Sequence, residues 1–80
     1  MPTTFGREIL GRDVVDHAAD KLGVLADFRI DMATGSITAL LVALEADLDP
    51  AMLPWPTIEG LLSVPIEEIA EVGVNIQLSR

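Results

Sequence analysis

Hydrophobic and polar residues alternate most clearly along residues 24–31, VLADFRID. Alternation with a period of two places successive side chains on opposite faces of a strand, so this segment predicts a strand with one face in the core and the other in water. The predicted core face consists of Val24, Ala26, Phe28 and Ile30. The next residues, MATGS, predict a hairpin turn, because Gly35 can take a positive φ and Asp31 can bond the backbone of the turn. The chain then returns as ITALLVAL, residues 37–44, whose two apolar faces indicate a strand that is covered on both sides or lies in the middle of a small barrel.

The beginning of the chain predicts a short helical turn followed by a short strand. Thr4 is the candidate cap of the turn, which presents Ile9 and Leu10 and is stopped by Gly11. Residues 13–16 carry two valines and predict the strand, and the polar residues 17–23 predict its connection to the next one.

The end of the chain predicts two more strands. Residues 61–64, LLSV, form the first, which ends at Pro65 because proline removes a ladder donor, and a helical turn then begins. Residues 70–78, AEVGVNIQL, alternate again and place Gly73 at a tight turn or bulge. Their predicted core face consists of Val72, Val74, Ile76 and Leu78.

Together these segments predict an all-β chain with short helical turns. About five or six short strands at such spacings favour a small closed or nearly closed β-barrel. The chain has 80 residues, 50% of them hydrophobic and 22% charged, which indicates one folded domain over residues 1–80, with a proline-rich loop at 46–60. Because a chain this short buries only about 60–65% of its unfolded surface, its exposed apolar surface tends to find a partner.

The charge of the chain limits the kinds of partner. Its net charge is −8 with five scattered Lys and Arg residues, which argues against nucleic-acid binding and favours a basic or apolar protein surface. The absence of cysteine excludes disulfides and thiolate metal sites. The longest apolar run, residues 37–44, is far shorter than the roughly 20 residues of a membrane span. We expect a cytoplasmic protein without direct membrane insertion.

Candidate chemical sites have simpler structural explanations. The metal-compatible side chains Asp13, Asp16, His17 and Asp20 fall across a strand end and a turn, without the spacing of a zinc or calcium site. Glu67 and Glu68 are adjacent acids, which diverge on a helical turn and suit its first residues. His17 has no obvious nucleophile to serve. We therefore predict no catalytic, cofactor-binding or metal-binding residues, and no enzyme.

The ordered segments REILGRDVVD, KLGVLADFRIDMATGSITALLV and SVPIEEIAEVGVNIQL resemble the PRC-barrel family, especially its small stand-alone archaeal members. The most specific pieces are GRDVVD, Gly23, the D-x-x-T-G-x-I hairpin at residues 31–37 and the V-P-x-E-x-I turn at residues 64–69. The resemblance implies a six-stranded β-barrel that acts as a non-catalytic adaptor. The chain departs from the family pattern in the segment 46–60, so the identity of its partner is open.

The resemblance implies two settings for such an adaptor. Archaeal members are implicated in cell division, where they bind the membrane-linked anchor of the tubulin-like division ring and pair with one another. The leading expectation is therefore an adaptor at the division site that binds this anchor or a PRC-barrel paralogue as a homo- or hetero-dimer. The alternative is an adaptor in ribosome or RNA-processing maturation that binds a basic ribosomal protein. An enzyme or ligand carrier would need a deep polar pocket, which a barrel packed with aliphatic side chains excludes.

Trp55 is the only tryptophan, and it lies between Pro54 and Pro56. It can fold back as a lid over one end of the barrel, or project outward as an anchor on a proline-stiffened loop. A dimer that completes the lid would satisfy both interpretations. The predicted partner or dimer contact consists of Met52, Leu53, Trp55 and Ile58. A second route to a partner is an unpaired strand edge, for which residues 24–31 and 73–78 are the candidates.

Overall fold

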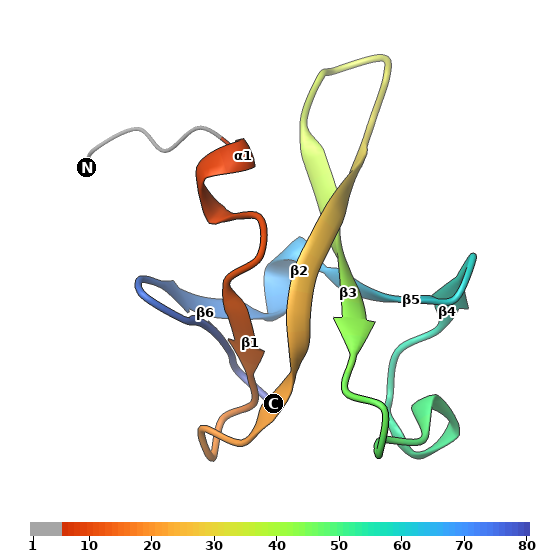
Figure 1. The fold of residues 1–80 in the computed structure, drawn as a ribbon. Helices are drawn as coiled ribbons and strands as arrows, with labels where there is room; N and C mark the ends of the chain where they lie inside the picture. Colours follow the sequence, from red (N-terminus) through yellow and green to blue (C-terminus); the bar gives the residue numbers. More distant parts are fainter. Residues whose placement is uncertain (1–5) are drawn as a thin grey trace.

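The computed structural model describes residues 6–80, so the cap predicted at Thr4 lies outside the described part of the chain. The helix α1 (Gly6–Ile9) is one turn long, and Gly11 follows it with a φ of 84°, as the predicted stop requires. The strands are β1 (Asp13–Val15), β2 (Lys21–Ile30), β3 (Ile37–Leu44), β4 (Thr57–Ile58), β5 (Leu61–Pro65), β6 (Ile69–Val72) and β7 (Ile76–Leu78). Two 3-10 helices complete the fold (Figure 1): η1 (Pro50–Met52) and η2 (Ile66–Glu68). The prediction of an all-β chain with short helical turns is confirmed.

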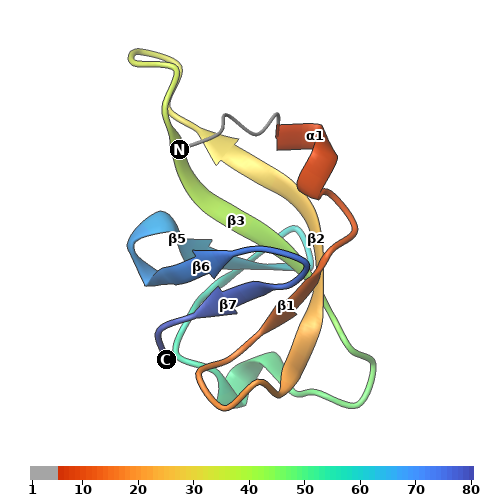
Figure 2. The same cartoon turned by 90° about the vertical axis from the view of Figure 1, so that its left-hand side faces the viewer.

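The strands form one sheet that curves around the core (Figure 2). Its order is β4-β5-β3-β2-β1-β7-β6, and every neighbouring pair is antiparallel except β1 and β7, which are parallel. The described residues therefore form seven strands where six were expected, and the sheet is not closed, because its end strands β4 and β6 each have one strand neighbour. The additional strand comes from the proline-rich segment, where Thr57 and Ile58 pair with Leu62 and Leu61 of β5.

Strand β2 begins at Lys21, earlier than predicted, so part of the expected connection belongs to the strand. Its predicted core face is wrong in part: Leu25 is buried, whereas Ala26 and Ile30 are exposed. The reason at Leu25 and Ala26 is a bulge against β3: Leu25 pairs with Val42, Asp27 pairs with Leu41, and Ala26 between them is left unpaired. One extra residue moves all later side chains to the opposite face, so Leu25 and Phe28 both pack on the core.

The hairpin between β2 and β3 has the predicted geometry. Gly35 has a φ of 75° and donates its N–H to the Asp31 carbonyl at 2.7 Å. The Asp31 Oδ1 atom accepts a hydrogen bond from the Ala33 N–H at 2.9 Å, as an Asx turn does. Strand β3 lies inside the sheet between β2 and β5, and Leu40 and Val42 are buried on one of its faces, whereas Leu41 and Ala43 on the other face are half-buried. The prediction of a strand covered on both sides is therefore right in part.

The last predicted strand is a hairpin instead. The chain reverses at Gly73, whose N–H donates to the Asn75 carbonyl at 2.9 Å, and β6 and β7 pair with each other. The turn predicted at Gly73 is confirmed, but the predicted core face is wrong at two positions, since Val72 is exposed and Val74 is 90% exposed at the hairpin tip. Only Ile76 and Leu78 enter the core, because they belong to the inner strand of the pair.

The core is one aliphatic cluster that includes the tryptophan. Its members are Ile9, Val14, Leu22, Leu25, Leu40, Val42, Trp55, Leu62, Val64, Ile76 and Leu78. Of the two predicted sheet edges, residues 73–78 are not an edge, because β7 pairs with both β1 and β6. The edge predicted at residues 24–31 is right in part: β2 pairs with β3 along its length, but β1 pairs with it only as far as Val24. Within residues 6–80, no helix has the length and apolar character needed to cross a membrane.

Candidate protein-binding surface

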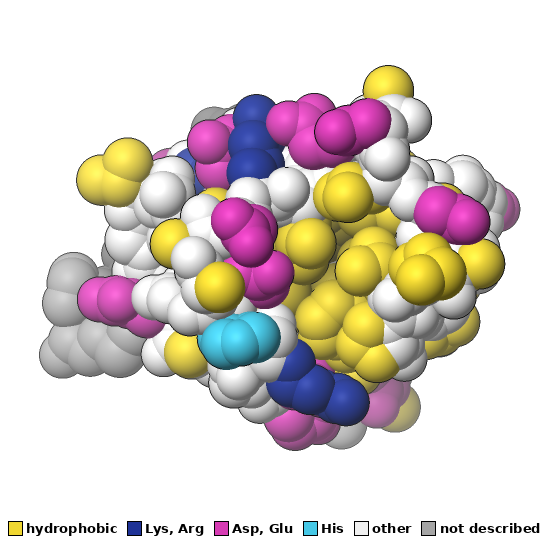
Figure 3. All heavy atoms as spheres, turned by 90° about the horizontal axis from the view of Figure 1, so that it is seen from below, with side chains coloured by type: hydrophobic (Ala, Val, Ile, Leu, Met, Phe, Trp, Pro, Cys, Tyr) yellow, Lys and Arg dark blue, Asp and Glu magenta, His cyan; other side chains and the backbone are white. Residues whose placement is uncertain are grey.

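The underside of the molecule carries an apolar hollow (Figure 3). One part has a volume of about 180 Å³ and is lined by Asp16, His17, Leu22, Leu53, Pro54, Trp55 and Arg80. A second part, of about 400 Å³, is lined by Asp49, Pro50, Ala51, Leu53, Trp55, Pro56 and Thr57. Leu53 and Trp55 line both parts, so the two form one surface, which we call the underside hollow. Its floor is apolar and its rim includes charged residues.

The proline-rich segment builds this surface through local backbone interactions. The Asp49 carboxylate caps η1 by accepting the Ala51 N–H at 2.9 Å, and Pro50 occupies the first turn, where a missing N–H costs nothing. The Leu53 N–H closes the turn on the Pro50 carbonyl at 3.1 Å. The Ser63 N–H then donates to the Pro56 carbonyl at 2.8 Å, which attaches the segment to β5 directly after Trp55. The backbone on both sides of the tryptophan is thereby fixed.

Trp55 itself is a lid on the core. Its side chain is 6% exposed and belongs to the buried cluster, which adds a large apolar group to a small core. The Arg80 guanidinium lies over the indole ring, 5.8 Å from the ring centroid, at a distance that allows a cation–π interaction. The indole N–H is buried and makes no regular hydrogen bond within the described residues.

Glu68 holds Arg80 in this position. The Arg80 Nε atom donates to Glu68 at 3.0 Å, and the Arg80 Nη2 atom donates to the same carboxylate oxygen. The Ser79 hydroxyl donates to the second oxygen at 3.2 Å. The hydrogen bonds from Arg80 are the main reason why the pKa of the Glu68 carboxyl lies below its usual range, and the hydrogen bond from the Ser79 hydroxyl adds weakly to that effect. The end of β7 and η2 are thus joined beside the tryptophan.

The structure separates the four predicted contact residues. Met52 is 82% exposed and does not line the hollow, although its chain neighbours Ala51 and Leu53 do; Leu53 is half-buried and lies beside Trp55. Ile58 is half-buried in β4 and does not line the underside hollow. Leu53 and Trp55 are therefore brought together, Met52 borders them, and Ile58 lies apart. Whether these residues contact a partner stays a prediction.

Several residues of the hollow are absent from the sequence prediction. Pro54 adjoins Trp55 in the sequence, and this neighbourhood could have pointed to it. Leu22, His17 and Arg80 come from distant parts of the chain, where the sequence pattern carries no sign of this surface. They reach it because the connection between β1 and β2 and the end of the chain meet at the underside.

The acids that were weighed as chemical candidates have local roles. Asp16 accepts the backbone N–H groups of Ala18 at 2.9 Å and of Asp20 at 3.0 Å, and so organises the turn before β2. Lys21 forms ion pairs with Asp13 at 3.3 Å and with Glu45 at 3.2 Å. These pairings, first with Glu45 and then with Asp13, raise the pKa of the Lys21 ammonium. Within the described residues, no group of three or more acids and histidines is placed to hold a metal ion.

The curled sheet with its strand order can now be compared with known proteins. The sequence model of the PRC-barrel domain family matches residues 1–76 of the chain. The chain belongs to the PRC-barrel domain family. Among solved structures, one that is similar at a TM-score of 0.63 is the crystal structure of a putative 16S ribosomal RNA processing protein, RimM, from Pseudomonas aeruginosa. The two sequences are 17% identical, and the match covers 100% of this PRC-barrel chain and 45% of the RimM chain, so this likeness shows the fold. No curated protein matches the chain.

Proposed function

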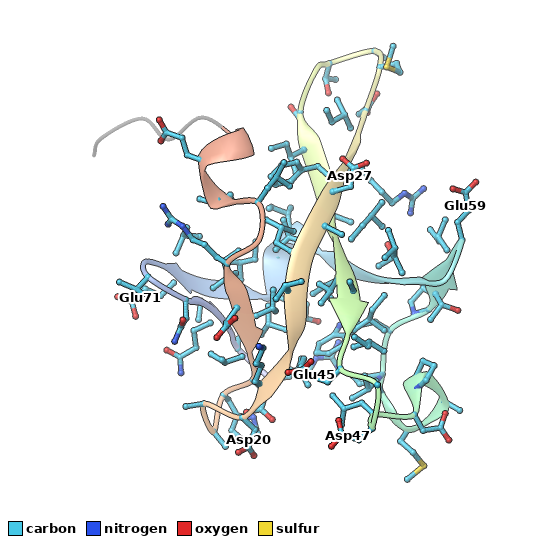
Figure 4. The ribbon with its side chains drawn as sticks, viewed as in Figure 1. Asp20, Asp27, Glu45, Asp47, Glu59 and Glu71 are labelled. Atoms are coloured by element: carbon cyan, nitrogen blue, oxygen red, sulfur yellow. The ribbon has the colours of Figure 1, made fainter. Side chains whose placement is uncertain are left out.

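We propose that this PRC-barrel chain is a non-catalytic adaptor that binds a basic protein through the underside hollow. The observation that carries the proposal is the apolar floor formed by Leu53, Pro54 and Trp55 at the end of the molecule where exposed acids gather. Asp49 lines the hollow, and Asp20 and Asp47 are exposed at the same end (Figure 4). An apolar anchor surrounded by unlike charge is typical of protein interfaces.

The form of the hollow supports binding rather than catalysis. The core beneath it is filled by aliphatic side chains and the tryptophan, so the surface offers a shallow apolar contact. Its charged neighbours Asp16 and Arg80 are held in a turn and in an ion pair, and neither faces a nucleophile or a metal group within the described residues. A shallow apolar surface suits a side chain of a partner protein better than a small substrate.

The proposed setting is ribosome or RNA-processing maturation. The similar solved structure is that of a putative 16S ribosomal RNA processing protein, and this chain corresponds to 45% of it. The net charge of −8 argues that RNA itself is not the ligand and that a basic ribosomal protein is. The family match and the solved structure add nothing to the division-ring interpretation, so a basic ribosomal protein takes precedence over the division-ring anchor or a paralogue as the proposed partner.

The experiment is a binding assay with purified small-subunit ribosomal proteins of the source organism, each tested singly against the immobilised chain. Met52→Ser removes an exposed apolar group between Ala51 and Leu53, which line the hollow, and Met32→Ser is the matched control, because Met32 is 93% exposed at the tip of the β2–β3 hairpin. We expect one ribosomal protein to bind the wild type and the control with the same Kd, and the Met52 variant more weakly. Binding of none of these proteins, or equal losses in both variants, would contradict the proposal.

A further inference from the structure

The upper half of β2 has one free edge. On the side away from β3, its partner β1 pairs only as far as Val24, and Leu25 is the last residue bonded to the segment before β1. The Leu25 N–H donates to the Arg12 carbonyl at 3.0 Å, and the Gly11 N–H donates to the Leu25 carbonyl at 2.8 Å. Beyond this point, no described strand pairs with that side of β2, which rises with β3 above the rest of the sheet (Figure 1).

The backbone groups at this edge point away from β3. The Arg29 carbonyl accepts the Thr38 hydroxyl at 3.3 Å, and the Asp31 N–H donates to the Ser36 carbonyl at 2.8 Å, so these two residues face β3. Backbone groups alternate in direction along a strand. The N–H and C=O groups of Phe28 and Ile30 therefore point outward, away from β3. The Phe28 N–H is bonded at 2.8 Å to the carboxylate of its own neighbour Asp27. An exposed row of this kind can accept another strand.

We propose that this edge, residues 26–30, pairs with the same edge of a second copy of the chain. In an antiparallel pair centred on Phe28, Asp27 of each copy lies opposite Arg29 of the other. The sequence Ala-Asp-Phe-Arg-Ile thus complements itself, with an apolar residue at each end and opposite charges on either side of the centre. Two such charge pairs on directly opposite positions stabilise the contact, and the two-fold symmetry makes both identical.

Charge complementarity selects this register over its neighbours. A pair centred on Asp27 would place two aspartates opposite each other. A pair centred on Arg29 would oppose two arginines and would also bring Asp27 against Asp31. Like charges on opposite positions are destabilising, so of these three neighbouring arrangements the one centred on Phe28 pairs opposite charges, and it alone pairs Asp27 with Arg29. A partner strand of another sequence would need a basic residue opposite Asp27 and an acidic residue opposite Arg29. A second copy of this chain provides both.

Exposed apolar side chains on the same hairpin add to the contact. Ile30 is 53% exposed and pairs with Ile37, which is also exposed, in the part of the hairpin that rises above the sheet. In the proposed dimer, Ile30 lies opposite Ala26 of the second copy and loses part of this exposure to water. The Asp27 carboxylate has to release the Phe28 N–H before it can pair with Arg29 of the other chain, because the N–H is then bonded across the dimer.

The test is light scattering coupled to size exclusion over a range of concentrations. We expect the wild type to approach twice the mass of one chain, while Asp27→Lys alone and Arg29→Glu alone keep the mass of one chain because each opposes like charges. An equimolar mixture of these two variants should regain the doubled mass, since Lys meets Glu on one side and Arg meets Asp on the other. Glu59→Lys, at the exposed turn between β4 and β5, is the control for a change of net charge.

Four outcomes would overturn the proposal. The wild type could keep the mass of one chain up to millimolar concentration. The mixture could be no heavier than its components, although circular dichroism shows both to be folded. Asp27→Lys could instead raise the mass, which would mean that Asp27 protects the edge from pairing. Finally, Met52→Ser could abolish a dimer that Asp27→Lys leaves intact, which would place the dimer contact at the underside hollow.

Discussion

At the scale of single residues, Trp55 and Met52 differ in a way that decides which of them can report on binding. Trp55 is 6% exposed in the core, so Trp55→Ala should lower the free energy of unfolding by about 3–5 kcal/mol, as expected for a buried aromatic residue. Met52→Ala should change it by less than about 0.5 kcal/mol, because Met52 is exposed. Chemical denaturation of both variants measures the difference. Equal effects would mean that Trp55 is not a core residue.

This difference affects the choice of variant for any binding experiment. A domain of this size has a total stability of roughly 5–15 kcal/mol, of which Trp55→Ala removes a large share. Loss of binding in that variant would therefore be confounded with loss of folding. Met52 lies between two residues that line the hollow and can be changed without that penalty, so it is the better probe of the partner contact.

Glu68 provides a second prediction at this scale, through pH. Because Arg80 stabilises the charged carboxylate in the folded chain, the pKa of Glu68 is lower folded than unfolded. The resulting stabilisation is complete above the unfolded pKa, roughly 4.3, and is lost as the pH falls through the folded pKa. We expect Glu68→Gln to lower the melting temperature at neutral pH and to lessen the decline in acid. Thermal melts from pH 7 to pH 2 test this.

Glu67→Gln is the matched control for that experiment. Glu67 is the exposed neighbour of Glu68 in η2, and within the described residues it has no ion pair. Its removal should leave the melting temperature and the acid limb close to those of the wild type. The same loss of stability in both variants would show that net charge, rather than the bond to Arg80, sets the acid dependence.

At the scale of elements, the close approach of β2 and β3 depends on Gly23. A Cβ atom at this position would lie 2.0 Å from the Ala43 carbonyl oxygen, which is backbone and cannot move without separating the strands. Gly23→Ala should therefore lower the free energy of unfolding by at least about 2 kcal/mol. Gly73→Ala is the control, since its nearest described neighbour would be 3.9 Å away. Denaturant titration compares the two, and equal stabilities would contradict this account.

The same pair of strands shows how far the sequence predicts the fold. Alternation predicts β2 as a strand, a continuous apolar run predicts β3, and the hairpin residues Asp31 and Gly35 predict the turn, because these signals are local. Alternation does not predict the bulge at Ala26, which depends on how β3 pairs with it and which brings Leu25 and Phe28 to the same face. Ile30 shares the face of Phe28 but is exposed, in the part of the hairpin that rises above the sheet (Figure 1). In the same way, Val74 continues a period-two pattern across a turn. Periodicity describes a strand only while its pairing is regular.

The sequence also predicts only the local part of the candidate site. An isolated tryptophan among prolines identifies the segment that forms the underside hollow, because aromatic residues contribute large contact areas. It does not identify Leu22, His17 or Arg80, which the folded sheet brings there from elsewhere in the chain. It also does not say whether the indole faces the core or the solvent. That depends on the space left by the rest of the cluster, which only the packed structure defines.

At the scale of the whole molecule, the two proposed contacts lie at opposite ends. The free edge of β2 belongs to the part of the hairpin that rises above the sheet, and the underside hollow lies below it (Figures 1 and 3). Two copies paired through β2 would leave both hollows accessible. Pairing would then raise the strength of attachment to a partner with two sites without altering the individual contact.

This arrangement predicts that the two contacts are independent. The Asp27→Lys variant should bind the basic partner with the same Kd per chain as Glu59→Lys, because both substitutions change the net charge equally and neither touches the hollow. Comparison with Glu59→Lys is needed because loss of negative charge slows association with a basic protein from any position on the surface. Titration calorimetry measures both affinities. A weaker Kd for Asp27→Lys alone would mean that the partner also contacts the β2 edge, and that dimer formation and partner binding compete for it.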